Sequence, residues 1–356
     1  NGDHQGSGRV GGDGVMAKLG EVCEVLDSKR VPITAANRVS GQYPYYGANG
    51  VQDYVADYIF DDELVLLAED GGNFGSKEKP IAYRVSGKCW VNNHAHVLKP
   101  KAVIDVDYLC YSLMFYDVSG LVNGATRQKL TQSDMRKMEI PLRTMVEQKN
   151  IVCRLNKLAE LISLRKQQLA KLDELVKARF VELFHGQGYP VLKWKDVFDT
   201  TTGKLDSNAA VENGIYPFFT CSKEVLRIDK YAFEQKALLL AGNNAAGKYD
   251  VKYYNGKFNA YQRTYVLGLK ENWSYRVFQY QLEDKLEYLQ QQSLGGLTKY
   301  LTLKILGELD FIIPPKNKQD EFDTFVERAD RQKQTVQQSL EKLQLMKKAL
   351  MQEYFG

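Results

Sequence analysis

The sequence lacks a strong excess of charge of either sign, and it contains no long hydrophobic run. Its 48 basic and 44 acidic residues leave a net charge of +4, which permits a nucleic-acid partner but does not demand one. The longest aliphatic runs, Leu64–Ala68 and Ala237–Ala241, are far too short for a membrane span, and the first fifteen residues hold no apolar signal core. We therefore expect a cytoplasmic protein without a membrane partner, in which any basic binding surface is local.

Metal and disulfide patterns are also missing. The five cysteines are scattered and never occur in Cys-x-x-Cys spacing, which favours free thiols in a reducing compartment. Among only four histidines, His94-Ala95-His96 could place two imidazoles on one face of a strand, but no cysteine or third histidine stands nearby. We expect no metal site.

The one sequence that resembles a catalytic motif is incomplete. Gly242–Lys248 fits the Gly-x4-Gly-Lys phosphate loop, but Tyr249 follows where magnesium coordination needs a serine or threonine hydroxyl. The corresponding turn of the first half, Asp70–Gly75, has no such lysine, so a duplicated turn explains both segments better. No Gly-x-Ser-x-Gly or His-Glu-x-x-His sequence occurs. We expect a non-catalytic chain, with a nucleotide-binding enzyme that uses Lys248 as the weakest alternative.

The sequence contains an internal repeat. Segments of the first half return in the second at a nearly constant offset: Gly41–Gly47 as Gly214–Thr220, Leu66–Ala68 as Leu239–Ala241, Gly124 and Leu130-Thr131 as Gly295 and Leu301-Thr302, Ile140-Pro141 as Ile313-Pro314, and Gln148 as Gln319. A drift of only two residues over such a span indicates that one domain-plus-helix unit was duplicated. The protein therefore performs one task twice.

Each copy has two parts of different composition. The first part is rich in Tyr, Phe, Gly and Asn and mixes short β-type runs with amphipathic segments such as Asp105–Tyr116 and Ser274–Gln292. The second part is free of proline and glycine and reads as one long helix. We predict an α+β protein with a disordered leader or tag (1–15), a mixed α/β domain (16–142), a long spacer helix (143–186), a second such domain (187–315) and a second long helix (316–356).

The two long helices carry matching apolar seams. Apolar side chains recur at alternating three- and four-residue steps, which predicts that the helices pair as an antiparallel coiled coil. The seam residues are Leu155, Leu158, Ile162, Leu169, Leu172 and Val176, and in the second copy Val336, Leu340, Leu343 and Leu350. Leu161, Leu164 and Leu175 lie on neighbouring faces, and we expect this additional strip to contact the helices of a partner protein.

Polar and aromatic residues at corresponding places in both copies are the candidate DNA contacts. Asn and Gln can pair with adenine, Arg and Lys with guanine, and all four can hold phosphates. The candidates are Tyr45, Tyr46, Asn73, Lys77, Asn92, Asn93, His94, Arg127, Gln128 and Lys129 in the first copy, and Phe219, Thr220, Lys223, Asn243, Asn244, Lys248, Tyr261, Gln262, Arg263, Thr298, Lys299 and Tyr300 in the second. Alternatively, these are solvated loop residues, with the aromatics in the core.

The order of these features resembles the specificity subunit of type I restriction-modification systems. Both copies show the same order of motifs. A Leu-Leu-Ala strand comes first, followed by a glycine-containing turn, a Gly…Leu-Thr block and an Ile-Pro exit. A long helix then begins at Glu147-Gln148 in the first copy and at Lys318-Gln319 in the second. The resemblance covers Met16–Gly356 and implies two target-recognition domains held apart by antiparallel helices with pseudo-twofold symmetry.

The resemblance also implies a function. Each domain would read one half of a bipartite, asymmetric double-stranded DNA site. Two methyltransferase subunits would bind the helices, and restriction motor-nuclease subunits would join them. S-adenosylmethionine, ATP and magnesium would belong to those partners. From the residues alone, a second hypothesis stays open, namely a non-DNA adaptor with two ligand-binding domains on a coiled-coil stalk.

Overall fold

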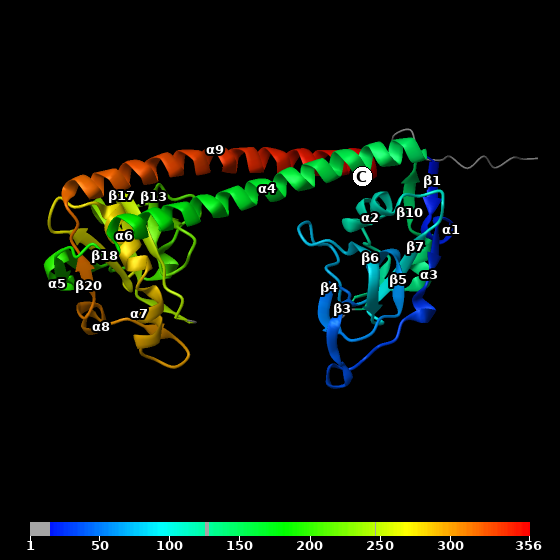
Figure 1. Cartoon of the computed structure of the whole chain (residues 1–356), viewed down its shortest axis with the longest axis horizontal. Coiled ribbons are helices and arrows are strands. Elements are labelled where there is room, and N and C mark those ends of the chain that lie inside the picture. The colour runs from blue at the N-terminus through cyan, green and yellow to red at the C-terminus, as the bar shows by residue number, and fades with distance from the viewer. Residues whose placement is uncertain (1–14, 125–127, 246) are drawn as a thin grey trace, which may run out of the picture. The chain divides into compact units, whose positions relative to one another are not determined.

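The computed structural model describes residues 15–124, 128–245 and 247–356, and the chain divides into two compact units (Figure 1). One unit comprises the residues up to Leu164 together with Ser339–Gly356, and the other comprises Arg165–Gln338. The predicted leader, residues 1–15, lies outside the described residues except for Val15, which belongs to strand β1.

The first unit contains one copy of the domain. Its strands are β1 (Val15–Lys18), β2 (Cys23–Val25), β3 (Ser40–Gly47), β4 (Gly50–Val55), β5 (Phe60–Ala68), β6 (Ala82–Val91), β7 (Ala95–Pro100), β8 (Val122–Asn123), β9 (Lys129–Leu130) and β10 (Glu139–Leu142). Its short helices are α1 (Leu19–Val22), α2 (Val106–Met114) and α3 (Gln132–Lys137), and the long helix α4 (Met145–Phe184) follows. The central sheet has the strand order β2-β7-β5-β6-β3-β4.

The second unit repeats this arrangement. Its strands are β11 (Val191–Lys193), β12 (Phe198–Thr202), β13 (Tyr216–Phe219), β14 (Leu226–Ile228), β15 (Phe233–Ala241), β16 (Asn243–Asn244), β17 (Val251–Ala260), β18 (Thr264–Leu269), β19 (Lys299–Tyr300) and β20 (Asp310–Ile312). Its helices are α5 (Trp194–Val197), α6 (Tyr275–Glu283), α7 (Leu286–Gln292), α8 (Leu303–Gly307) and the long α9 (Lys316–Phe355). The sheet order, β12-β18-β15-β17-β13-β14, matches that of the first unit strand for strand. The predicted internal repeat of mixed α/β domains is thus confirmed.

Each sheet buries its apolar runs because the central strands are covered on both sides. Leu64–Ala68 of β5 and Ala237–Ala241 of β15 are almost completely buried, and successive side chains join different core clusters. This alternation follows from the two-residue period of a strand. Ser274–Gln292, expected to be one amphipathic segment, is two helices, because a turn at Asp284-Lys285 allows Leu289 to enter the domain core.

The sequence signals for helix starts are confirmed. The hydroxyl of Thr131 accepts a hydrogen bond from the Asp134 backbone N–H, and Thr302 accepts one from Ile305 at the corresponding cap. After α3 the Ile-Pro segment is extended. Ile140 and Pro141 lie in β10, which pairs with β1.

The two long helices pair antiparallel within each unit. In the first unit, Arg154 of α4 donates to the hydroxyl of Tyr354 of α9 at 3.1 Å, and Leu155 packs in the same core as Tyr354. In the second unit, Asp173 pairs with Lys333 at 2.5 Å and Arg179 with Glu321, so the partner's number falls as the residue number in α4 rises.

The residues of the predicted seam are covered to different degrees. Leu155, Leu158, Leu172, Val176, Val336 and Leu340 are buried, and Ile162, Leu169, Leu343 and Leu350 are half-buried. Among the described residues, no helix combines the length and apolar character required for a membrane span. The five cysteines are free thiols, of which Cys23, Cys89 and Cys110 are buried.

A buried glutamine joins each long helix to its domain. The Gln148 carbonyl accepts the backbone N–H of Asp105, the N-cap of α2, at 2.8 Å, and its amide donates to the Val103 and Arg143 carbonyls. In the second unit, Gln319 accepts the N–H of Ser274, the N-cap of α6, at 2.7 Å and donates to the Pro314 carbonyl. Both side chains are buried, so each amide replaces water that the backbone groups cannot reach.

We predict that Gln148→Leu lowers the free energy of unfolding of the first unit by about 2–3 kcal/mol, because buried backbone groups lose their partners. Urea unfolding followed by circular dichroism measures this change. The control, Lys149→Ala, alters the next, exposed residue of the same helix and should change stability by less than about 0.5 kcal/mol. Equal stability of the two variants would contradict the assigned role of Gln148.

Candidate nucleic-acid interface

Three segments of the first domain meet at one end of its central sheet. They are the turn after β5, the loop between β6 and β7, and the β8–β9 segment. The Glu69 N–H donates to the His94 carbonyl at 2.9 Å, the Leu130 N–H donates to the Glu69 carbonyl at 2.7 Å, and Asp70 forms a β-bridge with Lys129. Because residues distant in sequence are tied by backbone bonds, their side chains form one surface.

The second domain builds the same junction from different residues. The Gly242 N–H donates to the Arg263 carbonyl at 2.9 Å, and the Leu301 N–H donates to the Gly242 carbonyl at 2.8 Å. Strand β16 pairs with β19, with Asn243 opposite Tyr300 and Asn244 opposite Lys299. Matching backbone bonds make Glu69 and Gly242 equivalent positions, and likewise His94 and Arg263.

Most of the predicted contact residues lie on or beside these junctions, and many are open to solvent. Those exposed are Lys77, Asn93, Gln128, Lys129, Lys223, Lys248, Gln262, Arg263, Thr298 and Tyr300, and those half-buried are Tyr46, Asn73, His94, Asn243, Asn244, Tyr261 and Lys299. Arg127 lies outside the described residues. The sequence alone did not predict which segments would converge, because that depends on sheet order.

Four predicted contacts are corrected by their burial. Tyr45 is 1% exposed and its hydroxyl bonds with the backbone of Ile33, while Phe219 is 4% exposed and packs against Phe258. Asn92 and Thr220 are also buried, and both shape the backbone of their own loops by accepting N–H groups two residues on. These side chains support the surface from inside and cannot touch a ligand in this conformation.

The phosphate-loop alternative fails on local structure. Gly242–Lys248 runs from β15 through β16 towards β17, and among the described residues between these strands there is no helix to present its N-terminus to a phosphate. Gly247 has a φ of 66°, and its N–H donates to the Asn244 carbonyl, as expected for a tight turn.

Beneath the first junction lies a buried charged network that sequence reasoning missed. His96 is fully buried, and its Nδ1 lies 2.7 Å from the Asp27 carboxylate, whereas its Nε2 lies 2.9 Å from the Leu130 carbonyl. A carbonyl can only accept, so Nε2 carries a hydrogen. His94 does not join His96 but pairs with Asp70 at 2.6 Å.

Two cations complete this network. Arg30 donates to Glu69 at 2.5 Å and lies 3.6 Å from Asp27, and Lys129 lies 3.0 Å from the other oxygen of Glu69. Ligand atoms of Asp27, Glu69 and His96 lie within 4.8 Å of one another, a donor set that a metal ion could use. With Arg30 and Lys129 already paired to these carboxylates, however, the network satisfies its own charges, and we assign it a structural role.

The pKa of Asp27 reflects this environment. Burial alone would raise the pKa, but the hydrogen bond and charge of His96, with hydrogen bonds from the Val97 N–H and the Gln132 amide, lower it below the usual value. The carboxylate is therefore the form that the folded domain stabilises.

The structure also reveals one cluster that occurs identically in both copies. Tyr43 and Tyr58 lie 5.1 Å apart with Lys88 over the Tyr58 ring, and Tyr216 and Tyr231 lie 5.1 Å apart with Lys257 over the Tyr231 ring. Aligning the two halves of the sequence would have exposed this repetition. Tyr43 and Tyr216 fall in the repeated segments Gly41–Gly47 and Gly214–Thr220, whereas the other four residues lie outside the repeated segments given above.

We predict that Asp27→Asn lowers the free energy of unfolding at pH 7 by about 3 kcal/mol, because Arg30 and the buried His96 lose a carboxylate that they contact. A lowered folded-state pKa stabilises the fold above about pH 4 and loses that contribution as the pH falls through the folded value. The deficit of the variant should therefore shrink at pH 3 in urea titrations. The control, Asp61→Asn, changes an exposed carboxylate. Equal deficits of the Asp27 variant at both pH values would contradict this account.

Comparison with known proteins connects this architecture to a family. The chain is 37% identical over 145 residues to a putative type I restriction enzyme specificity subunit of Haemophilus influenzae, covering 41% of this chain and 37% of the relative. It is 32% identical over 170 residues to the EcoDI specificity subunit of Escherichia coli, covering 44% and 37%. The aligned part thus spans little more than a third of each relative.

Solved structures share the fold over nearly the whole chain. The type I restriction-modification S subunit of M. genitalium superposes with a TM-score of 0.64 at 15% identity, covering 96% of both chains. A chain from a study of complex assembly and conformational transition of the type I system superposes with a TM-score of 0.54 at 16% identity, covering 98% of this chain and 99% of that one.

A family model covers most of the sequence in two separate matches. The model describes the type I restriction modification DNA specificity domain, and it matches residues 13–174 and 187–345. The two matches correspond to the two structural repeats, each with the larger part of its long helix. Such domains are recognition modules and not catalytic ones. The chain therefore belongs to the type I restriction modification DNA specificity domain family, with two copies of the domain.

Proposed function

We propose that this chain is the DNA-recognition subunit of a cytoplasmic type I restriction-modification complex and reads a bipartite, asymmetric DNA target. The observation that carries the proposal is the pair of matching junctions, built on the same strand order and the same backbone bonds but with different exposed side chains. Two equivalent scaffolds with different side chains can read two different sequences.

The differences between the copies suit base recognition. The first junction offers Asn93 and His94 where the second offers Gln262 and Arg263. In the major groove, amide side chains can pair with adenine, and arginine can pair with guanine, so such exchanges alter which base is favoured. The half-sites would then differ in sequence, which makes the whole target asymmetric.

Affinity would come from the DNA backbone. Around the two junctions the exposed lysines outside the buried network are Lys77, Lys223 and Lys248, and such cations neutralise phosphates and release counterions. The net charge of the chain is only +4, so this positive surface is local and not a property of the whole molecule. This local positive charge favours DNA recognition over the alternative of an adaptor that binds an uncharged ligand.

We further propose that the long helices set the spacing between the half-sites. Helices α4 and α9 each have 40 residues, and a helix of that length measures about 60 Å. An unread spacer between the half-sites would follow from this length, as dimer geometry sets operator spacing in other DNA-binding proteins.

The same helices offer apolar side chains for partner subunits. Leu161, Leu164 and Leu175 are 42%, 49% and 51% exposed, an apolar strip outside the seam. We propose that two methyltransferase subunits bind the helices and that restriction motor-nuclease subunits join the complex. S-adenosylmethionine, ATP and magnesium would then be bound by those partners.

Exchange of residues 190–315 for the corresponding domain of a family member with another target should change one half-site and leave the other intact, because each domain reads independently. The measurement is sequencing of methylated DNA from cells that carry the hybrid chain with its methyltransferase. Exchange of residues 16–142 is the matched control and should change the opposite half-site. Alteration of both half-sites by either hybrid would contradict modular reading.

A further inference from the structure

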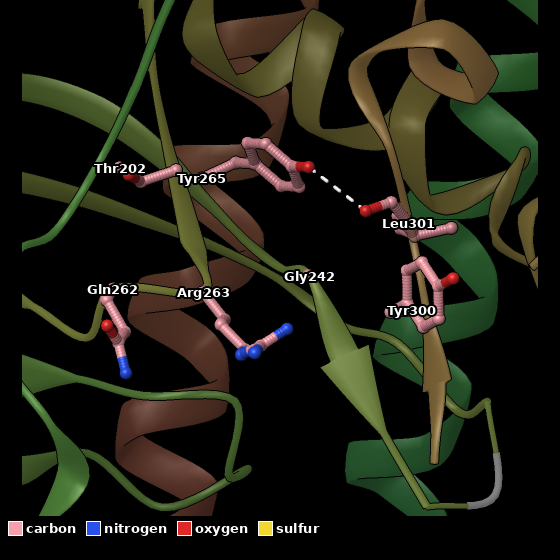
Figure 2. Close-up of a pocket in the computed structure, with 7 residues that line it drawn as sticks. All are labelled: Thr202, Gly242, Gln262, Arg263, Tyr265, Tyr300 and Leu301. Atoms are coloured by element: carbon pink, nitrogen blue, oxygen red, sulfur yellow. Dashed lines mark hydrogen bonds between the residues drawn. The ribbon is translucent and has the colours of Figure 1, made fainter. Parts of the chain in front are cut away.

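The second domain contains a small open pocket at its junction (Figure 2). Seven residues line a cavity of about 280 Å³: Thr202, Gly242, Gln262, Arg263, Tyr265, Tyr300 and Leu301. They come from β12, the turn after β15, the loop between β17 and β18, β18 itself and the β19 segment. In Figure 2 the Arg263 side chain extends from its loop into the open space beside Gly242.

The matching place in the first domain is filled by the charged network. Thr202 and Tyr265 pair across β12 and β18 at the positions of Asp27 and His96, and the Tyr265 hydroxyl donates to the Leu301 carbonyl at 3.1 Å, as His96 does to Leu130. The repeat thus uses one location in two ways. In the first domain it holds ion pairs, and in the second it leaves a cavity.

The second domain lacks the carboxylates that pair with cations in the first domain, so Arg263 can contact a ligand. Thr202, Gly242 and Asn243 stand where the first domain has Asp27, Glu69 and Asp70. None of the seven lining residues is acidic, and no ion pair is recorded for Arg263 within the described part of the chain. The nearby carboxylate of Asp206 accepts from Gln262, at 3.5 Å. The pocket therefore presents an arginine without a counter-charge.

Gly242 keeps the wall of the pocket close to the arginine backbone. A Cβ at this position would lie 2.4 Å from the Arg263 carbonyl oxygen and 3.0 Å from the Tyr265 ring. Both neighbours are held, the carbonyl by the Gly242 N–H and the ring by its bond to Leu301. The loop that carries Arg263 is thus fixed against the sheet, so the guanidinium is presented from a defined backbone position.

We propose that this pocket receives the major-groove edge of a guanine in the half-site read by the second domain, with Arg263 donating to N7 and O6. Guanidinium has donors and no acceptor, so it matches the two adjacent acceptors of guanine and not the donor amino groups of adenine or cytosine. Tyr300, 39% exposed, offers a ring at the pocket edge. The proposal rests on the function proposed above and adds the base that this site selects.

A base contact fits the divergence of the copies better than a phosphate contact. The sugar-phosphate backbone is the same in both half-sites, so two copies of one domain would be expected to hold phosphates with similar residues. At this location every charged residue differs between the copies. The first domain, in which Lys129 and His94 are paired to Glu69 and Asp70, is not expected to bind guanine there.

The test begins with the target sequence, obtained by sequencing methylated DNA from cells that carry the chain with its methyltransferase. The full complex is then titrated with target duplexes that carry 7-deazaguanine, which lacks N7, at each guanine of that half-site in turn. We expect one position to weaken binding by about 10- to 100-fold. Arg263→Ala should weaken binding similarly and become insensitive to that replacement.

Two further variants sharpen the result. Arg263→Lys keeps the charge but loses the planar pair of donors, so its affinity for the target should fall between those of the wild type and Arg263→Ala. Arg227→Ala removes an exposed arginine of the same domain outside the pocket and should retain sensitivity to 7-deazaguanine. Arg263 is itself exposed, so its variants should melt at the wild-type temperature.

Several outcomes would overturn the assignment. A second half-site without guanine would do so at once, as would unchanged target binding by Arg263→Ala. If a methylphosphonate abolished the effect of Arg263 and 7-deazaguanine did not, the ligand would be a phosphate. In these cases, specific binding of the target by the wild-type complex would still support the proposed function. If the wild-type complex failed to distinguish its target from unrelated DNA, both the proposed function and the guanine contact would be contradicted.

Discussion

A buried glutamine at the start of each long helix accepts the backbone N–H that opens a domain helix and donates to backbone carbonyls. Gln148 and Gln319 make this connection in the same way, with Asp105 and Ser274 as the respective partners. Because a buried amide cannot exchange these groups for water, the helix and the domain form one mechanical unit. Each glutamine thus couples the start of a long helix to the domain that precedes it.

Duplication separates the parts of this domain that build the fold from the parts that can vary. Strand order, caps and buried glutamines are the same in both copies, as is the Tyr-Tyr-Lys cluster. The junction at the end of the sheet differs in almost every exposed side chain, and the space beneath it holds ion pairs in one copy and a pocket in the other. A scaffold whose backbone bonds are independent of side chains tolerates such exchange.

Much of the architecture was predictable because it depends on local or periodic signals. The seam of Leu155 to Val176 predicted the long helix α4, the Thr131 cap predicted the start of the short helix α3, and the Ile-Pro segment predicted an extended exit. The candidate interface was harder to predict from the sequence, because convergence of the turn after β5 with the loop after β6 depends on the order of strands in the sheet. Tyr45 and Phe219 were expected on the surface but are buried, because successive side chains of a strand point to opposite faces and these two point to the core. The role of Asp27 has no local signature, since its partner His96 is distant in sequence.

We propose that the paired helices determine the distance between the two half-sites of the target. Insertion of seven helical residues into both α4 and α9, after Leu164 and after Gln338, lengthens each helix by about 10 Å, or roughly three base pairs of DNA. Sequencing of methylated sites from cells that carry the lengthened chain should then yield the same two half-sites with a longer spacer. An unchanged spacer in an assembled, active complex would contradict the account.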